Sequence, residues 1–307
     1  MLMERPIPLY VGSGSPLSNV GTLTNQGIEL EVGYKLSVDK VNLSFLANAS
    51  YVKNEIKNLG NQTGYIDKES LPTLGTVSRN QNGYPIGYFF GYKAIGVFQT
   101  QEEIDNYISP ATGKPIQPNA VPGDTKFEDL NGDGVISDDN EDRTMIGKPN
   151  PDWIVGLTVA ADWNGFDLSA FFQGSFGADV FDALRRYELA AVNYTSDALE
   201  RWTGPGTSNS MPRIVLGDTP KNFRPSTLLV HDASFLRLRN LQVGYTLPAQ
   251  LTRKAYIQRL RFYASFDNLL TITGYKGMDP EIGSTMGIDK GVYPQARVYT
   301  FGLNLTF

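Results

Sequence analysis

Apolar and polar residues alternate along several stretches of this chain, and residues 295–307 give the clearest case. The large apolar positions there are Tyr299, Phe301, Leu303, Leu305 and Phe307, and the positions between them are Thr300, Gly302, Asn304 and Thr306. Successive side chains of a β-strand point to opposite faces of the sheet, so this spacing predicts a strand with one apolar and one polar face. Such an apolar face meets a core in a soluble sandwich and lipid in a membrane barrel.

The same alternation predicts two long hairpins and two further strands. The alternating stretches are residues 28–36, 41–51, 153–163, 166–173, 235–246 and 260–266. The first hairpin turns at residues 39–40, and the Asn164-Gly165 pair is a strong signal for a two-residue turn in the second. In the fifth stretch the apolar positions change parity at Arg239-Asn240, which predicts a β-bulge that restores a single apolar face.

Short and long connections alternate along the chain. The short ones lie near residues 39–40, 164–165 and 247–257, and the long ones near residues 101–150, 177–230 and 268–294. Short turns at one end and long loops at the other are typical of transmembrane barrels. We therefore expect an all-β fold, a transmembrane antiparallel β-barrel segment of about nine or ten strands whose long loops are extracellular.

Three weaker patterns complete this prediction. Residues 87–100 are rich in aromatic residues and are expected to form another barrel strand. A short strand near residues 73–79 is expected because an even strand count requires it. Residues 182–202 carry apolar side chains at roughly helical spacing and predict a helix inside the second long loop.

Composition excludes several classes of function. The chain has 307 residues, a net charge of -5, no Cys and one His. It has no basic run, so nucleic acid is not an expected partner. The lone His231 leaves no base for a catalytic triad, and we expect no catalytic residues, no organic cofactor and no enzymatic activity. Residues 1–10 lack the apolar core of a signal peptide, although a barrel protein must be secreted. The chain is therefore either a mature protein or one whose front part is absent, and we expect the second.

One motif carries metal-binding chemistry. Asp129, Asn131 and Asp133 place oxygen ligands at the first, third and fifth positions of a loop that resembles the start of an EF-hand, with a glycine at the sixth and the carbonyl of Val135 at the seventh. Asn140 stands where a closing acid is expected, so Asp139 and Asp142 are the candidates for that role. This spacing predicts a structural Ca²⁺ site. The alternative is a loop held by its own Asx turns.

Six segments together resemble the SusC/RagA family of TonB-dependent outer-membrane receptors, the glycan and peptide importers of Bacteroidetes. They are NVGTLTNQGIELEV at 19–32, GYPIGYFFGYKAIGVFQTQEEI at 83–104, GDTKFEDLNGDGVI at 123–136, IGKPNPDW at 146–153, FLRLRNLQVGYTLP at 235–248 and FYASFDNLLTITGYKGMDPE at 262–281. They follow the family's order and cover almost the whole chain.

The resemblance implies a barrel of about 22 strands closed by an N-terminal plug domain. It also implies coupling to the TonB complex and a SusD-like surface lipoprotein that lids the barrel. Residues 1–307 match only the C-terminal part of that architecture, without the plug domain. The last strand, which ends on Phe307, also resembles the closing strand that the assembly machinery of outer-membrane barrels recognises.

The expected function is TonB-dependent import of a nutrient, an oligosaccharide or a peptide, across the bacterial outer membrane. The expected partners are the lipoprotein, the TonB complex, membrane lipid and the cargo. Two alternatives remain open at this point. One is a small self-closed barrel that acts as a porin or adhesin, and the other is a soluble β-rich module that binds glycans through a calcium loop.

Overall fold

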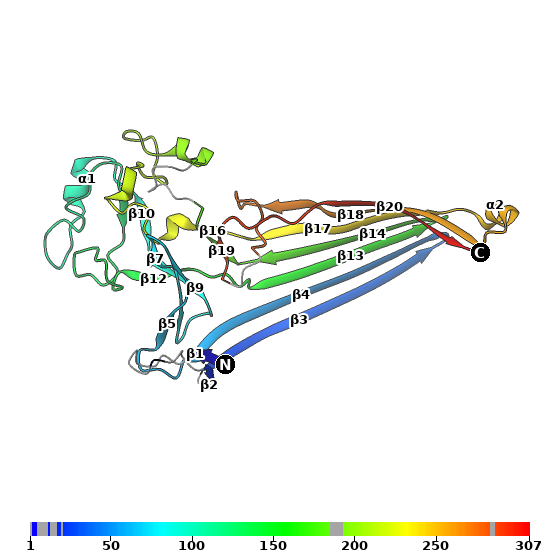
Figure 1. Cartoon of the computed structure of the whole chain (residues 1–307), viewed down its shortest axis with the longest axis horizontal. Coiled ribbons are helices and arrows are strands. Elements are labelled where there is room, and N and C mark those ends of the chain that lie inside the picture. The colour runs from blue at the N-terminus through cyan, green and yellow to red at the C-terminus, as the bar shows by residue number, and fades with distance from the viewer. Residues whose placement is uncertain (1, 5–11, 13–16, 20, 185–192, 283–285) are drawn as a thin grey trace.

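The fold is organised by one sheet of long antiparallel strands. The computed structural model describes residues 2–4, 12, 17–19, 21–184, 193–282 and 286–307. Within these ranges the sheet has seven strands in the order β20-β18-β17-β14-β13-β4-β3. They are β3 (Thr22–Val38), β4 (Val41–Asn58), β13 (Trp153–Trp163), β14 (Phe166–Phe176), β17 (Phe235–Thr246), β18 (Arg259–Thr273) and β20 (Val298–Thr306). Figure 1 shows them side by side as a curved, elongated wall.

The predicted hairpins are present, and their register places the apolar residues of all seven strands on one face. One row of paired residues crosses the whole sheet: Tyr34, Phe45, Val159, Ala170, Leu241, Phe266 and Tyr299. The apolar side chains of this face are largely uncovered, as in Ile28 at 75% exposure and Phe301 at 76%. An apolar surface seven strands wide far exceeds the patches that soluble monomers expose, so this face is the lipid-facing one.

Aromatic residues mark both ends of the apolar face. Tyr51 and Trp153 are paired at the loop end, with ring centroids 5.0 Å apart. Trp163, Phe166 and Tyr245 contact one another in sequence at the turn end. The two rows are about ten residues apart, or ~34 Å along a strand and ~26 Å along the membrane normal at a typical tilt. This separation matches the hydrocarbon band of an outer membrane, with aromatic girdles at its two boundaries.

The opposite face of the sheet is mostly polar. Alternate positions carry side chains such as Glu29, Asn48, Gln173 and Arg261, and the apolar exceptions include Leu46, Val52, Ile154 and Phe171. Charges on this face are also neutralised across an intervening strand: Arg261 of β18 reaches over β17 and donates two hydrogen bonds to the carboxylate of Asp167 on β14. A face of this composition lines the water-filled side of a barrel wall.

The predicted β-bulge lies at Arg239. On one side of β17, Leu238 pairs with Phe172 and Asn240 with Phe171, so Arg239 is the extra residue. The register also shifts at this point on the other side of β17, against β18. The bulge returns Leu236 and Leu238 to the same face as Leu241 and Val243, because an extra residue reverses the parity of the strand.

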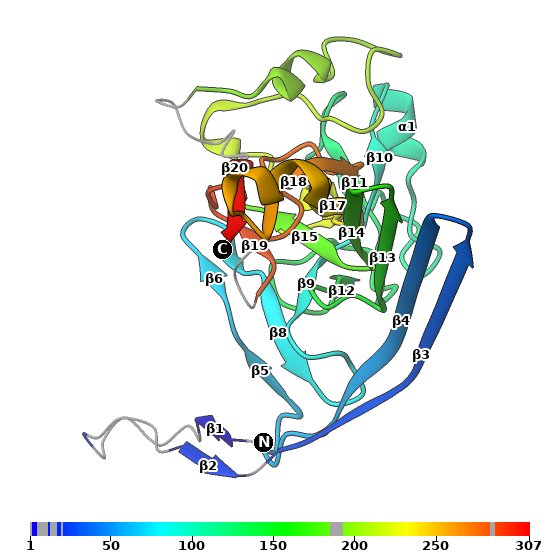
Figure 2. The same ribbon diagram turned by 90° about the vertical axis from the view of Figure 1, so that its right-hand side faces the viewer.

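The long connections form a separate lobe beyond the loop end of the wall (Figures 1 and 2). It contains α1 (Gln101–Asn106) and small sheets built from β5 (Tyr65–Asp67), β6 (Ser70–Leu71), β7 (Gly75–Thr76), β8 (Ser78–Gln81), β9 (Tyr88–Tyr92), β10 (Ala94–Val97), β11 (Thr125–Phe127), β12 (Arg143–Gly147), β15 (Asp179–Asp182), β16 (Val230–Asp232) and β19 (Ile288–Asp289). The apolar core lies here, for example around Phe89, Phe181, Leu229 and Ile288. The lobe therefore has an interior of its own, whereas the wall is a single layer.

Short elements complete the description. The 3₁₀ turns are η2 (Ser196–Glu200), η3 (Leu216–Asp218), η4 (Thr227–Leu229) and η5 (Arg253–Ala255). The short connection before β18 contains α2 (Ala249–Thr252), and β1 (Leu2–Glu4) pairs with β2 (Leu17–Asn19). Within the described part of the chain, no helix combines the length and the apolarity needed to cross a membrane.

Three expectations about the strands and helices need correction. Residues 87–100 do not cross the membrane but form β9 and β10 in the lobe, and the expected strand near 73–79 is β7 and the start of β8, also in the lobe. The wall thus has seven strands in the described residues, rather than about nine or ten. An odd number of strands fits this wall, because β3 begins at the loop end and β20 ends at the opposite, turn end. The predicted helix at 182–202 is reduced to η2, with Asp182 in β15, while residues 185–192 lie outside the described residues.

The wall is open at both edges. Among the described residues, β3 pairs only with β4, and β20 pairs only with β18. The first and last strands of the sheet therefore present unpaired backbone groups, and no closed barrel forms from the described strands. A membrane requires these groups to be paired, so the wall needs further strands on each side.

Candidate functional site

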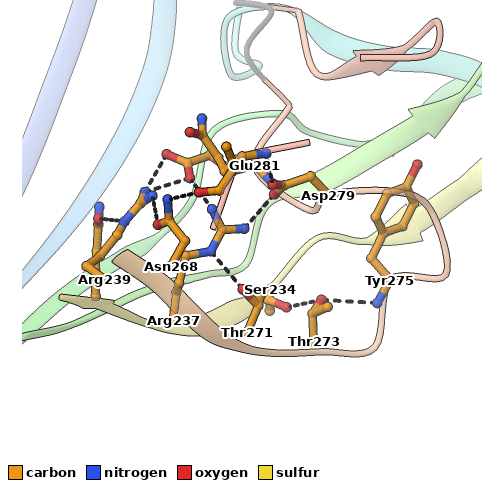
Figure 3. Close-up of polar contacts among 12 residues, drawn as sticks. Ser234, Arg237, Arg239, Asn268, Thr271, Thr273, Tyr275, Asp279 and Glu281 are labelled. Atoms are coloured by element: carbon orange, nitrogen blue, oxygen red, sulfur yellow. Dashed lines mark hydrogen bonds and ion pairs between the residues drawn. The ribbon is translucent and has the colours of Figure 1, made fainter. Parts of the chain in front are cut away.

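A charged network lies on the polar face of the wall, where β17 meets the last long loop (Figure 3). Its centre is Arg237, whose side chain is 1% exposed. The guanidinium donates to Asp279 Oδ1 at 2.6 Å, to Glu281 Oε2 at 3.1 Å and to Thr271 Oγ1 at 2.9 Å. A buried arginine needs such partners, because its charge is costly to remove from water without them.

The bulged residue Arg239 extends the network. Its Nη2 donates to both carboxylate oxygens of Glu281, at 2.7 and 2.6 Å. Its Nε donates to Gln173 Oε1 at 2.7 Å, and its Nη1 to Asn268 Oδ1 at 3.3 Å. The bulge thus turns Arg239 toward the polar face beside Arg237, and Glu281 bridges the two arginines.

Asp279 connects the network to the backbone of the loop. Burial alone would raise its pKa, but the N–H groups of Gln295 and Glu281 and the guanidinium of Arg237 donate hydrogen bonds to the carboxylate and hold its pKa below the ordinary value. Asn268 also donates to the carbonyl of Ala296. The network therefore fastens both ends of the segment 279–296 to the wall.

Residues 129–142, which we call the acidic loop, contain the residues predicted as metal ligands. The structure shows how their side chains are hydrogen-bonded. Asp129 accepts from the N–H groups of Gly132 and Gly134 at 2.7 and 2.9 Å. Asn131 accepts from Asp133 N, and Asp133 accepts from Val135 N. These are Asx turns of the kind proposed as the alternative reading of the motif.

Asp142 is the acid that turns into this loop. It is fully buried and accepts from the N–H groups of Leu130 and Ser137. Asp139 accepts from the hydroxyl of Ser137 and the N–H of Glu141. Among the described residues, no group of three or more His, Cys, Asp or Glu side chains has the arrangement of a metal site. All of these residues lie in one loop: Asp129, Asn131, Asp133 and Asp142 accept hydrogen bonds from backbone N–H groups between residues 130 and 137, whereas Asp139 bonds to Ser137 and Glu141.

His231 lies in β16 with its Nε2 3.7 Å from Asp182 Oδ2. The network around Arg237 and Arg239 was not predicted from the sequence. The available signal was two arginines within the apolar stretch FLRLR of β17, since charges on a membrane strand must face its polar side.

Comparisons with known proteins place the chain among membrane receptors. No protein-family model matches it. It is 33% identical to the "TonB-dependent receptor P3" of Formosa agariphila and 30% identical to the "TonB-dependent receptor SusC" of Bacteroides thetaiotaomicron, with all of this chain and 31% and 29% of those proteins covered. A chain of the RagAB peptide transporter superposes over all of this chain and 32% of its own length, with a TM-score of 0.77 and 26% identity. The chain thus spans about a third of the length of the relatives it matches.

Proposed function

Because the chain belongs to the SusC/RagA family of TonB-dependent receptors of the bacterial outer membrane, we propose that it forms part of the barrel wall, and an extracellular lobe, of a nutrient importer. The observation that carries this proposal is the two-faced wall. Its outer face is apolar across seven strands between two aromatic girdles, and its inner face is polar and charged. Such a wall separates lipid from an aqueous passage, and the comparisons support a receptor rather than an enzyme.

We propose that the whole receptor depends on the TonB complex and works with a SusD-like lipoprotein over the loop end. The further strands that the open edges require, and a plug domain, come from the rest of the receptor in this proposal. The proposed cargo is an oligosaccharide or a peptide. The structurally similar RagAB is named a peptide transporter, which shows that a receptor of this fold can carry peptides. The two smaller alternatives, a self-closed barrel and a soluble module, fit less well, because β3 and β20 do not pair and the apolar face is uncovered.

Cysteine labelling tests the orientation of the wall in cells. This chain has no Cys, so each single substitution adds one thiol to it, and the unsubstituted full-length receptor shows any labelling that arises elsewhere. A membrane-impermeant maleimide should label Thr112→Cys in the lobe on intact cells. It should label Lys40→Cys in the β3–β4 turn only after the outer membrane is permeabilised. Labelling of both positions, or of Lys40→Cys alone, on intact cells would contradict the proposed orientation.

An uptake assay tests the import function. A strain that lacks the receptor gene and a strain that lacks TonB should both lose uptake of the same labelled oligosaccharide or peptide. The complemented strain should regain it. Normal uptake of every cargo in the strain without the receptor gene would refute the proposal.

A second proposal concerns the acidic loop. We propose that residues 129–142 bind Ca²⁺ as a structural ion that stiffens the first long loop. The oxygen-rich spacing of Asp129, Asn131 and Asp133 supports this, as does the inward position of Asp142. Carboxylate oxygens that accept one hydrogen bond keep a further lone pair for a cation.

A further inference from the structure

Two adjoining clefts in the lobe share a positively charged wall. Their volumes are about 680 and 660 Å³, and Arg224 lines both. Both volumes lie in the range of small-molecule sites, about 300–1,000 Å³. Segments far apart in the sequence build them, from residues 73–75 through the acidic loop to residues 217–225. We call the two clefts together the cationic groove.

The groove carries more cations than acids that can neutralise them. The cations are Lys114, Arg143, Lys221 and Arg224, and the acids are Asp124, Asp138 and Asp218. Two of these acids have other partners. Asp124 is buried and accepts from Arg213 Nε at 2.6 Å and from Asn222 Nδ2 at 3.1 Å. Asp218 accepts the backbone N–H groups of Asn222 and Phe223 at 2.8 and 2.9 Å. Asp138 is the acid that pairs with the groove cations Lys221 and Arg224.

Asp138 serves two of the four cations. Its carboxylate accepts a hydrogen bond from Lys221 Nζ and lies 3.9 Å from Arg224 Nη1. Its side chain is 67% exposed, so the pair with Lys221 is open to competition from a ligand. Among the described residues, no carboxylate lies within ion-pairing distance of Lys114 or Arg143. The groove thus has four cations, and its exposed acid Asp138 pairs with two of them.

The two arginines are held in place by aromatic rings. The guanidinium of Arg224 lies 4.7 Å from the ring centroid of Tyr92 and 4.9 Å from that of Phe127, and that of Arg143 lies 4.3 Å from the centroid of Phe90. Arg143 donates only to neutral acceptors, the carbonyls of Thr76 and Phe90 and the amide of Asn140. Arg143 Nε and Arg224 Nη1 are buried without a hydrogen-bond acceptor in the described part of the chain. Among the described residues, Arg143 has no anionic partner and Arg224 has only its 3.9 Å contact with Asp138. Guanidinium groups fixed in this way are arranged to receive an anion.

We propose that the cationic groove binds an acidic oligosaccharide through its carboxylate or sulfate groups, with Asp138 as the internal anion that the ligand displaces. Hydroxyl and amide side chains beside the cations match the hydroxyls of sugar rings: Thr73, Thr112, Asn119 and Thr219. Lys221 and Arg224 contact the charged group that replaces Asp138, and Lys114 contacts a second charge in the adjoining cleft. As a statement about cargo this rests on the proposed import function, but the binding itself is measured without transport.

Calorimetry on the purified full-length receptor, at fixed Ca²⁺ concentration, tests this site. The probes are a uronate oligosaccharide, a sulfated one, a neutral one of the same length, an oligo-aspartate peptide and inorganic sulfate. The acidic oligosaccharides should bind, and their affinity should fall as the salt concentration rises. Equal binding of the neutral oligosaccharide, tighter binding of the peptide, or binding of inorganic sulfate with the same affinity would each overturn the proposal.

Three variants separate the site from general charge effects. Lys221→Gln, whose side chain is half exposed and tolerates replacement, should weaken binding about tenfold, because it removes one charge-assisted hydrogen bond. Asp138→Asn should strengthen binding about threefold or more, because it removes the internal competitor. Lys93 is an equally exposed lysine that pairs with Glu128 outside the groove, so Lys93→Gln should leave the affinity unchanged.

Opposite effects of Lys221→Gln and Asp138→Asn are the signature of this site, since a merely unfolded lobe would weaken binding in both. Unchanged affinity in both variants would overturn the proposal. A receptor that binds the acidic oligosaccharide as expected but does not import it would leave the groove in place and remove the proposed import function.

Discussion

Arg237 Nη2 and Asp279 Oδ1 lie 2.6 Å apart, with the two side chains only 1% and 6% exposed. The pair joins β17 of the wall to a loop that is more than forty residues away in the sequence. A buried ion pair of this kind fixes how the two segments dock, because burying either charge without its partner is strongly unfavourable. The last long loop is therefore held over the polar face of the wall in one arrangement.

Removing one partner of this pair should release the loop. Arg237→Met leaves the carboxylate of Asp279 buried without its guanidinium, which should lower the free energy of local opening by about 3 kcal/mol. Hydrogen exchange at the amides of Glu281 and Gln295, which donate to Asp279, measures this opening in the full-length receptor. Lys57→Ala, which breaks an exposed pair with Glu55, is the control and should change exchange at neither amide. Unchanged protection in Arg237→Met would show that the pair does not hold the loop.

A carboxyl group in the lobe should destabilise the fold at neutral pH. Burial raises the pKa of Asp179 above its ordinary value of 3.8, and the nearby Asp232 adds to this effect, while the N–H of Lys148 opposes it. A raised folded-state pKa means that the stability contribution is present below the ordinary value and is lost as the pH rises through the folded pKa. Asp179→Asn, which keeps the acceptor for Lys148, should therefore raise the melting temperature at pH 7 and leave it nearly unchanged at pH 3.

Melting curves of the full-length receptor at the two pH values check this sign. Asp105→Asn, an exposed carboxylate on α1, is the control. A variant at Asp179 that melts lower than the parent at pH 7 would contradict the expected direction.

Calcium should bind to the acidic loop through its first three oxygen ligands. Asp129→Ala together with Asp133→Ala should abolish a Ca²⁺ titration that the parent receptor shows, because two of the hard ligands are lost. Asp139→Asn should have a smaller effect, since Asp139 bonds to Ser137 and Glu141 and not to the first residues of the motif. Calorimetry with Ca²⁺ measures both, and hydrogen exchange shows whether the loop stays folded. Identical titrations for the parent and the double variant would rule the site out.

The wall was predictable from the sequence because its environment imposes a strict period. Lipid on one side and water on the other force alternation, and the reversal of parity at Arg239 revealed the bulge before the pairing was known. The mistaken strand at residues 87–100 shows the limit. Tyr88, Phe89 and Phe90 are apolar on both faces of β9, and all are buried in the lobe. A continuous apolar run indicates a strand covered on both sides, and only the absence of a polar face distinguished it from a membrane strand.

The charged sites were less predictable, for a physical reason. The pairing of Arg237 with Asp279 depends on how a long loop folds back, and no local spacing encodes it. The cationic groove likewise combines Arg143 and Lys221 from two separate loops. The acidic loop was recognised because its chemistry is contained within fourteen consecutive residues, 129–142.

The two faces of the wall should respond oppositely to the same charge at adjacent positions. Val159 pairs with Phe45 and Ala170 on the apolar face, near the middle of the band between the two aromatic rows. Ala160 pairs with Ser44 and Ser169 on the polar face. An arginine at the bilayer midplane costs about 2–4 kcal/mol on the lipid side of a barrel. Val159→Arg should therefore lower the unfolding free energy of the receptor in lipid by that amount.

Ala160→Arg is the matched control, because it adds the same side chain one residue away. Its guanidinium enters the water-lined side among serines, where a substitution changes stability by about 0.5 kcal/mol or less. Denaturant titration of the folded receptor in lipid bilayers, followed by tryptophan fluorescence, measures both variants. Equal losses at the two positions would mean that lipid does not cover the apolar face. A larger loss at Ala160 would reverse the assignment of the two faces, and would place Arg237, Arg239 and Glu281 on the lipid side of the wall.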